Sequence, residues 1–393
     1  MKWQLEHIRT EPALKDEIDR LIREGRYPHA VMFYGPSGSP KVRLALSWVS
    51  ALLCLAADQR RPCGQCRSCR YMEQLMHPDL HCVVPVPSGY AREGEVLKWW
   101  SESIVDHPEL QLTEWVDILQ SRASKRKDAE SATGPGTGGA RRVRANISAE
   151  ALLEAMETMY HKSYAGGAKV LFVWMPEYLG KEGNRLLKLV EEPPDDAYIV
   201  FVAEKLHPIL PTLLSRVWKY RVPPYSREDL LHVLEGSSAQ LDHFKGVEGF
   251  DGRDYEGVRY FMQRDNLEYL ERWMEAIMQG DRLLWRKEAD ALQRRSTDDI
   301  LALLKGWLFV LQKGLEWRAS GREGAQFLFK ERNIIRNFAE KVPLSVLIGM
   351  QSVLEQSMVD IRRNVQVRLW YMYFNHEMEA LWKGTRRKKM LAE

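Results

Sequence analysis

Apolar residues in the first 225 positions of the chain alternate between strand-like and helix-like patterns. Continuous apolar runs, which predict buried strands, lie at 30–34, 169–174 and 198–203, and helical patterns lie at 12–25, 41–55 and 148–160. Strands that alternate with helices in this way form a parallel sheet with helices on both faces. The sequence therefore predicts an α/β domain in this part of the chain.

The pattern changes after the Pro-Pro pair at 223–224, because no strand-like run follows it. Ser226 can cap a helix, and the remaining sequence consists of amphipathic helical patterns separated by short breaks. We therefore expect three domains: the α/β domain at 1–224, a small helical domain at about 225–285, and a longer helical bundle at about 286–393.

A long insertion at roughly 88–145 interrupts the α/β pattern. Its first half has a helical pattern around Trp99, Trp100 and Trp115. Residues 125–142 contain no large apolar side chain, so they cannot bury enough surface to become ordered, and we expect a flexible loop there. The sequence assigns no role to the insertion.

The composition is that of an ordinary globular protein. Of the 393 residues, 57 are basic and 54 acidic, so the net charge of +3 argues against a chain that coats nucleic acid. The thirteen Trp residues suggest large buried or interface surfaces. No run approaches the roughly 18 apolar residues that a membrane span requires, and the N-terminus has no apolar signal core. We expect a cytoplasmic protein that does not contact a membrane.

Four cysteines have the spacing of a metal site. Cys54, Cys63, Cys66 and Cys69 form the pattern C-x8-C-x2-C-x2-C, within a module at about 54–82. Four thiolates suit a tetrahedral Zn²⁺ ion, and a site closed by four protein ligands leaves no open position for catalysis. The spacing therefore predicts a structural zinc site.

Two other interpretations of the cysteines stay open. An iron–sulfur cluster is the nearest chemical rival, but the expected cysteine three residues after Cys69, followed by proline, is missing. The thiols could also be free of metal. Cys82 lies in an apolar strand pattern, and we interpret it as a core residue.

The segment between the first strand and the next helix looks like an incomplete phosphate loop. Gly35, Gly38 and Lys41 are present, as in a loop whose backbone amides and lysine hold phosphates. Pro40 replaces the second glycine of the motif, and Val42 replaces the hydroxyl residue that holds Mg²⁺. We expect no Mg-ATP binding here. The alternative is an ordinary turn with Lys41 as a surface charge.

The strand at 169–174 supports the same conclusion. In phosphate-loop ATPases this strand leads into an acidic pair that serves the metal and the water. Here the corresponding positions are Trp174 and Met175. Glu177 could be a displaced carboxylate, but we interpret it as a solvated residue at a helix start.

Taken together, these motifs resemble one family, the delta-prime subunit of the bacterial DNA polymerase III clamp loader in the AAA+ superfamily. The segments that carry the resemblance are Tyr27–Gly38, the cysteine cluster with His77-Pro-Asp79, Asn184–Pro194 and Leu210–Arg216. The resemblance covers about 1–87 and 145–225 well, and the helical remainder loosely.

The resemblance implies an AAA+ domain with an inserted zinc module, a helical lid and a C-terminal helical collar. It implies a hetero-pentamer with gamma/tau motor subunits and a delta subunit, which opens a sliding clamp and closes it around primed DNA. Arg216, after Ser215, would be the finger that acts in trans on ATP bound by a neighbouring subunit. Val217 stands where the family often has cysteine. Residues 203–205 lack the Thr or Asn that senses the γ-phosphate.

Two alternatives belong to other functional classes. An active gamma/tau-type ATPase would have glycine at position 40, a hydroxyl residue at position 42 and an acidic pair at 174–175, and all of these are missing. A zinc-dependent DNA-binding protein that acts alone would need a concentrated basic face. The basic run at 386–389 is more typical of a solvated helix end.

Overall fold

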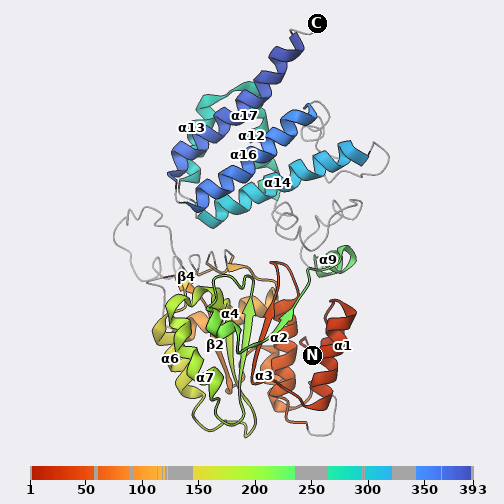
Figure 1. The fold of residues 1–393 in the computed structure, drawn as a ribbon, viewed down its shortest axis with the longest axis vertical. Coiled ribbons are helices and arrows are strands. Elements are labelled where there is room, and N and C mark those ends of the chain that lie inside the picture. Colours follow the sequence, from red (N-terminus) through yellow and green to blue (C-terminus); the bar gives the residue numbers. More distant parts are fainter. Residues whose placement is uncertain are drawn as a thin grey trace. The chain divides into compact units, whose positions relative to one another are not determined.

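The computed structural model describes residues 2–56, 61–87, 93–122 (without 113, 117, 120 and 121), 145–234, 264–320 (without 294 and 296) and 342–390 (without 364). These residues form two compact units, which divide in the sequence between Asp229 and Leu230 (Figure 1). The predicted flexible loop at 125–142 lies outside the described residues. The separate lid at 225–285 and collar at 286–393 stay predictions.

The first unit contains a parallel sheet, as the sequence predicts, and this sheet has five strands. Its strands are β1 (Ala30–Tyr34), β2 (Leu80–Val83), β5 (Lys169–Trp174), β6 (Ala197–Ala203) and β7 (Trp218–Arg221), in the spatial order β2-β5-β6-β1-β7. A two-residue antiparallel pair, β3 (Val86–Pro87) and β4 (Ala145–Asn146), lies apart from it. The sequence analysis did not predict β7, because Tyr220 is the only buried residue of this edge strand.

The helices of the first unit follow the predicted pattern closely. They are α1 (Pro12–Glu24), α2 (Lys41–Leu52), α3 (Arg67–Glu73), α4 (Glu93–Asp106), α6 (Ala149–Thr158), α7 (Leu186–Glu191) and α8 (Pro211–Leu214), with 3-10 turns at Leu5–His7, Pro176–Tyr178 and Gly180–Arg185. Helix α9 (Arg227–Leu234) contains the division between the two units. The predicted caps are confirmed, since the Ser148 hydroxyl accepts the Ala151 amide and the Ser226 hydroxyl accepts the Asp229 amide.

Two separate apolar cores cover the two faces of the sheet. Figure 1 shows α1 and α2 on one side and α6 and α7 on the other. Successive strand residues point to opposite faces. Phe172 therefore belongs to the core with Trp48 of α2, whereas Leu171 belongs to the core with Leu152 of α6. Each fully buried side chain of this size contributes about 1.5–3 kcal/mol of transfer free energy.

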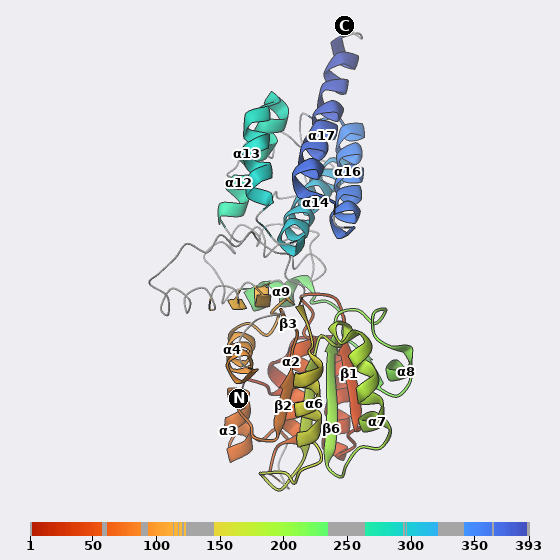
Figure 2. The same ribbon diagram turned by 90° about the vertical axis from the view of Figure 1, so that its left-hand side faces the viewer.

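The second unit is helical throughout its described residues. Its helices are α12 (Arg264–Gln279), α13 (Arg282–Leu292), α14 (Thr297–Ser320), α16 (Leu344–Arg362) and α17 (Val367–Met390). α17 packs against α12, α13 and α16 (Figure 2), and Phe374 of α17 stacks between Trp273 and Trp370. Among the described residues, no helix is both long and apolar enough to cross a membrane.

Candidate functional sites

The phosphate-loop segment connects β1 to α2 at the carboxyl edge of the sheet. The Gly35 amide donates to the Ala203 carbonyl at 3.2 Å, and a Cβ at Gly35 would lie 2.1 Å from the Val222 carbonyl oxygen. Gly38 has a φ of 73°, which side chains rarely adopt. Chain geometry therefore requires glycine at both positions, whether or not the loop holds phosphate.

Lys41 is buried and already paired within the chain. Its ammonium group donates to the Pro36 carbonyl at 2.9 Å and lies 3.6 Å from Oε1 of Glu204, which follows β6. Only 6% of the Lys41 side chain is exposed, so the interpretation of Lys41 as a surface charge is wrong, whereas the ordinary turn stays an alternative. A carbonyl and a carboxylate of the chain itself therefore pair with the Lys41 ammonium group.

Trp174 is the last residue of β5 and one of the two positions at which the sequence lacks the acidic pair of an ATPase. Its side chain is fully buried, and the Trp100 ring of α4 lies 5.9 Å away between ring centroids. Trp100 also lies 5.8 Å from Phe172. Trp174 therefore belongs to an apolar aromatic cluster and offers no oxygen ligand to a metal ion.

Arg43 and Glu109 form a buried ion pair beside the same loop. Arg43 Nε lies 2.5 Å from Glu109 Oε1 and Nη2 lies 3.2 Å from Oε2, and the Tyr225 hydroxyl donates to Oε1 at 2.7 Å. Burial by itself would raise the pKa of Glu109, but the Arg43 charge and the two donors outweigh it and hold the pKa below its usual value. Glu109 is therefore ionised near neutral pH.

The interpretation of Glu177 as a solvated residue is wrong. It does begin a turn, at Pro176–Tyr178, but its Oε1 accepts the amides of Glu204 at 2.8 Å and Lys205 at 3.2 Å. Its Oε2 is buried, and the described residues give it no hydrogen-bond partner. Burial raises the pKa of Glu177 to about 7. This carboxylate anchors the segment that carries Glu204.

Arg216 lies at the surface after α8. Its Nε lies 2.5 Å from Oε1 of Glu191, and Nη1 donates to the Thr212 carbonyl at 3.0 Å and to the Ser215 hydroxyl at 3.2 Å. The side chains of Arg216 and Glu191 are 43% and 47% exposed. Exposed ion pairs of this kind contribute only about 0–1 kcal/mol, so a stronger anion could replace Glu191.

The four predicted cysteines come together in space. Their sulfur atoms all lie within 4.8 Å of one another, and the Cys63 and Cys69 sulfurs are 3.9 Å apart. In a tetrahedral site with Zn–S bonds of about 2.3 Å, sulfurs lie about 3.8 Å apart, so the set fits zinc. Amides of the knuckle donate to these sulfurs, as in the 3.4 Å contact from Cys66 to Cys63.

The surroundings of the cluster favour the thiolate form of Cys54. A hydrogen bond from the Cys69 thiol lowers the pKa of Cys54 to about 4 and, in return, the pKa of Cys69 is raised. A metal ion would displace the remaining protons from the cluster. Burial raises the pKa of Cys82 to about 12, which agrees with its interpretation as a core residue outside the cluster.

The His77-Pro-Asp79 motif connects the cysteine module to the sheet. The Nδ1 atom of His77 accepts the Asp79 amide at 3.1 Å, so Nε2 carries the proton and donates to the Ser68 hydroxyl at 2.9 Å. The Asp79 carboxylate accepts the amides of Tyr164 and Ala165 at 2.6 and 2.9 Å. The motif therefore supports the module instead of acting as a ligand.

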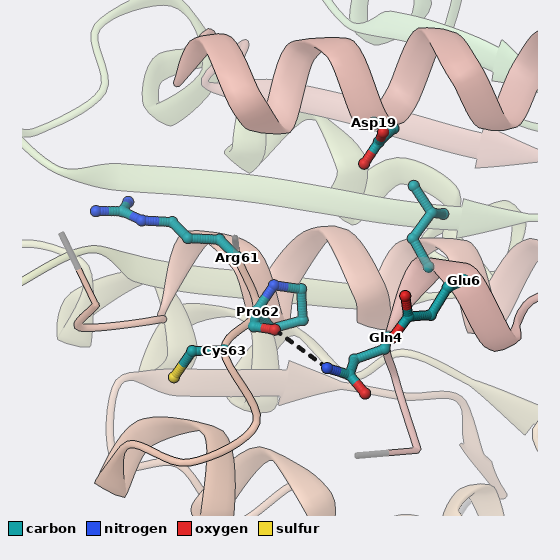
Figure 3. Close-up of a pocket in the computed structure, with 7 residues that line it drawn as sticks. Gln4, Glu6, Asp19, Arg61, Pro62 and Cys63 are labelled. Carbon is teal, nitrogen blue, oxygen red and sulfur yellow. Dashed lines mark hydrogen bonds between the residues drawn. The ribbon is translucent and has the colours of Figure 1, made fainter. Parts of the chain in front are cut away.

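A cavity of about 210 Å³ lies next to this module (Figure 3). It is lined by Gln4, Leu5, Glu6, Asp19, Arg61, Pro62 and Cys63. Gln4 spans it to the Pro62 carbonyl at 3.5 Å, and Cys63 is the only residue of the cluster that lines it. The cavity therefore lies beside the metal-type site and not within it.

The family assignment rests on a match over much of the first unit. A family model described as "DNA polymerase III, delta subunit" matches residues 10–226, which are more than half of the chain. The chain belongs to this family. The resemblance to delta-prime subunits and the predicted AAA+-type α/β fold are thus confirmed.

Three relatives of this family member share one name with one another. The "DNA polymerase III subunit delta'" of Pseudomonas aeruginosa is 23% identical over 261 residues, covering 61% of this chain and 63% of the relative. That of Bacillus subtilis is 26% identical over 216 residues, covering 55% and 48%, and that of Escherichia coli is 23% identical over 222 residues, covering 55% and 50%. The alignments thus span less than two thirds of these relatives' own length.

A solved structure shows weaker similarity to this family member. A DNA polymerase III gamma subunit-related protein from Thermotoga maritima aligns with 93% of this chain and 100% of its own, at 13% identity and a TM-score of 0.36. This score is too low to support an argument.

In this delta-prime family member, sequence reasoning located some site residues and missed others. The structure brings the four cysteines together and places Gly35, Gly38 and Lys41 at one edge of the sheet, whereas Arg216 lies apart from them and contacts Glu191, Thr212 and Ser215. Glu204, Arg43 and Glu109 were missed. No motif marks them, because their partners come from distant parts of the sequence.

Proposed function

We propose that this chain is the non-hydrolysing delta-prime subunit of a DNA polymerase III clamp loader. In this role it joins gamma/tau motor subunits and a delta subunit in a hetero-pentamer that loads a sliding clamp on primed DNA. One observation carries the non-hydrolysing part: Lys41, the only phosphate-binding side chain left in the loop, is buried against Glu204 and the Pro36 carbonyl. The aromatic residue Trp174 at the end of β5 adds to this, since it offers no oxygen to a metal ion.

We further propose that Arg216 acts in trans on ATP bound by a neighbouring motor subunit. Its guanidinium is exposed and loosely held by an exposed carboxylate, so it can exchange Glu191 for the more highly charged γ-phosphate. An arginine in that position stabilises the charge that develops during phosphoryl transfer. Ser215 supports the arginine by accepting a hydrogen bond from Nη1.

The cysteine cluster is proposed as a structural zinc site. Cys54, Cys63, Cys66 and Cys69 would hold the ion, and their mutual distances suit tetrahedral coordination. Because four protein ligands close the coordination sphere, the ion would stabilise the knuckle and take no part in a reaction.

ATP hydrolysis by a reconstituted clamp loader tests the proposal. The motor subunits, the delta subunit, the clamp and primed DNA of the same organism are combined with wild-type chain, with Arg216→Ala, or with Arg185→Ala. Arg185 is a matched control, because it is also an exposed arginine paired with a carboxylate, Glu182. We expect stimulation by the wild type and by Arg185→Ala, and its loss by more than about tenfold with Arg216→Ala.

The same experiment distinguishes this proposal from the main alternative, an active ATPase subunit. If this chain hydrolysed ATP by itself, it would be an active gamma/tau-type subunit, and the interpretation of the loop would be wrong. If Arg216→Ala stimulated like the wild type, the finger would be assigned to the wrong residue.

A further inference from the structure

The insertion that the sequence left without a role reaches the phosphate-loop edge of the sheet. Its described part, residues 93–122, places Trp100 on Trp174 and Glu109 on Arg43. Trp115 fixes this segment to the first unit, because its indole N–H donates to the Pro85 carbonyl at 2.9 Å in a buried contact. The described part of the insertion therefore contributes to the packed core of the first unit.

The first turn of α2 has an unusual charge distribution. Lys41 and Arg43 both lie in this turn, and it contains no acidic residue. The N-terminal end of a helix carries a partial positive charge, so two cations there repel both the helix dipole and each other. In a nucleotide-binding protein, bound phosphates neutralise such an end.

Here two carboxylates from elsewhere in the chain neutralise the turn. Glu204, after β6, lies 3.6 Å from Lys41, and Glu109, in the insertion, forms the two-pronged pair with Arg43. Trp100 and Trp174 pack together in the apolar core that also contains Val42 and Leu44 of α2. The negative charge that bound phosphates would supply is thus supplied by the protein.

We propose that residues 93–122 are a built-in plug of the nucleotide site. Glu109 of the plug and Glu204 after β6 would together take the place of phosphate in that site. The plug also fixes the segment between β7 and α9, because Glu109 accepts the Tyr225 hydroxyl. The phosphate loop, the insertion and this segment are then held in one arrangement whether or not ATP is present. This inference concerns the chain's own nucleotide site and does not depend on Arg216.

Hydrogen exchange of the full-length chain, followed by mass spectrometry, tests the plug. Glu109→Gln keeps the shape of the side chain but removes its charge. Glu102→Gln is the matched control, since Glu102 lies in the same insertion but pairs with Arg122 at the surface. We expect Glu109→Gln to lower amide protection in 41–46 and 218–225 by about tenfold or more, and Glu102→Gln to leave both unchanged.

Tyr225→Phe provides a second variant in case Glu109→Gln does not fold. It removes one hydrogen bond from Glu109 and should lower protection in the same two peptides by a smaller factor. Unchanged protection in both peptides, in a folded Glu109→Gln or in Tyr225→Phe, would overturn the plug.

Binding of inorganic tripolyphosphate tests directly whether the carboxylates of Glu109 and Glu204 take the place of phosphate. In the double variant Glu109→Gln/Glu204→Gln, Lys41 and Arg43 lose their internal anions. We expect this variant to bind tripolyphosphate about tenfold or more tightly than the wild type, because two uncompensated cations remain at a helix N-terminus. Equal binding to both proteins, or binding to neither, would show that the two carboxylates do not stand in for phosphate.

Discussion

The ammonium group of Lys41 lies 3.6 Å from the carboxylate of Glu204, and the lysine is almost completely buried. The two residues are 163 positions apart in the chain, yet they meet because β1 and β6 are paired in parallel, with Tyr34 opposite Ala203. The lysine of the predicted phosphate loop is therefore part of the internal structure of the first unit.

Removing the charge of Glu204 should destabilise the first unit more than removing that of Lys41. Glu204→Gln leaves a buried ammonium without its anion, and we expect a loss of about 1–3 kcal/mol in the free energy of unfolding. Lys41→Met keeps the buried alkyl chain, and Glu204, which is 24% exposed, can be hydrated instead. Urea unfolding of both variants, with the exposed Glu192→Gln as control, measures the difference. A larger loss for Lys41→Met would contradict this asymmetry.

The pH dependence of stability should report on Glu177. Its pKa is raised to about 7 in the folded protein from an ordinary value of 4.5, so the folded state keeps a proton that the unfolded state has released. Stability contributed by this group is therefore present at low pH and is lost as the pH rises towards about 7. Glu177→Gln stays neutral, and its stability relative to the wild type should increase by about 1–3 kcal/mol between about pH 5 and about pH 8.

Thermal or urea unfolding at several pH values measures this change. Glu157→Gln, at an exposed position of α6, serves as the control and should follow the wild type. If the free energies of unfolding of the wild type and Glu177→Gln differ by the same amount at every pH between about 5 and about 8, then Glu177 does not titrate as described.

Gly35 should tolerate no side chain. In Gly35→Ala the new Cβ would lie 2.1 Å from the backbone oxygen of Val222, so β1 and the end of β7 would have to separate. We expect a loss of about 3 kcal/mol or more. Gly94→Ala, where nothing lies within 4 Å of the added Cβ, should be neutral or slightly stabilising. Measured free energies of unfolding of the two variants test this prediction. Equal values would show that the backbone near Val222 moves away from the new Cβ without loss of stability.

Loss of one cluster cysteine should remove zinc and destabilise the first unit. Cys66→Ser leaves three thiol ligands, and the binding free energy of a structural metal is part of the folding free energy. We expect about one zinc per wild-type chain, none or much less in Cys66→Ser, and a clearly lower melting temperature. Cys82→Ser is the control, because Cys82 lies outside the cluster and should keep the metal. Equal metal content in the wild type and Cys66→Ser would exclude the zinc site.

Much of the fold could be predicted because local pattern and tertiary environment agree. The apolar runs at 169–174 and 198–203 are buried on both faces, so hydrophobicity alone identifies β5 and β6. The cysteine cluster could also be predicted, since C-x2-C-x2-C brings three thiols close together within a single knuckle. By contrast, β7 has one buried residue, and its place at the sheet edge depends on pairing with β1, which no local pattern records.

The sequence by itself determined the residue types at each position: a proline and a valine in the phosphate loop, a tryptophan at the end of β5, and four cysteines at metal spacing. By their chemistry alone, these residues predict that the chain has no ordinary Mg-ATP site. Only the tertiary structure decided which charges meet. Glu204 reaches Lys41 through parallel strand pairing, Glu109 reaches Arg43 through the packing of the insertion, and Glu177 is buried where the pattern indicated solvent. Electrostatic pairs of this kind depend on distances of a few ångströms between remote segments, and those distances exist only once the sheet and its two cores have formed.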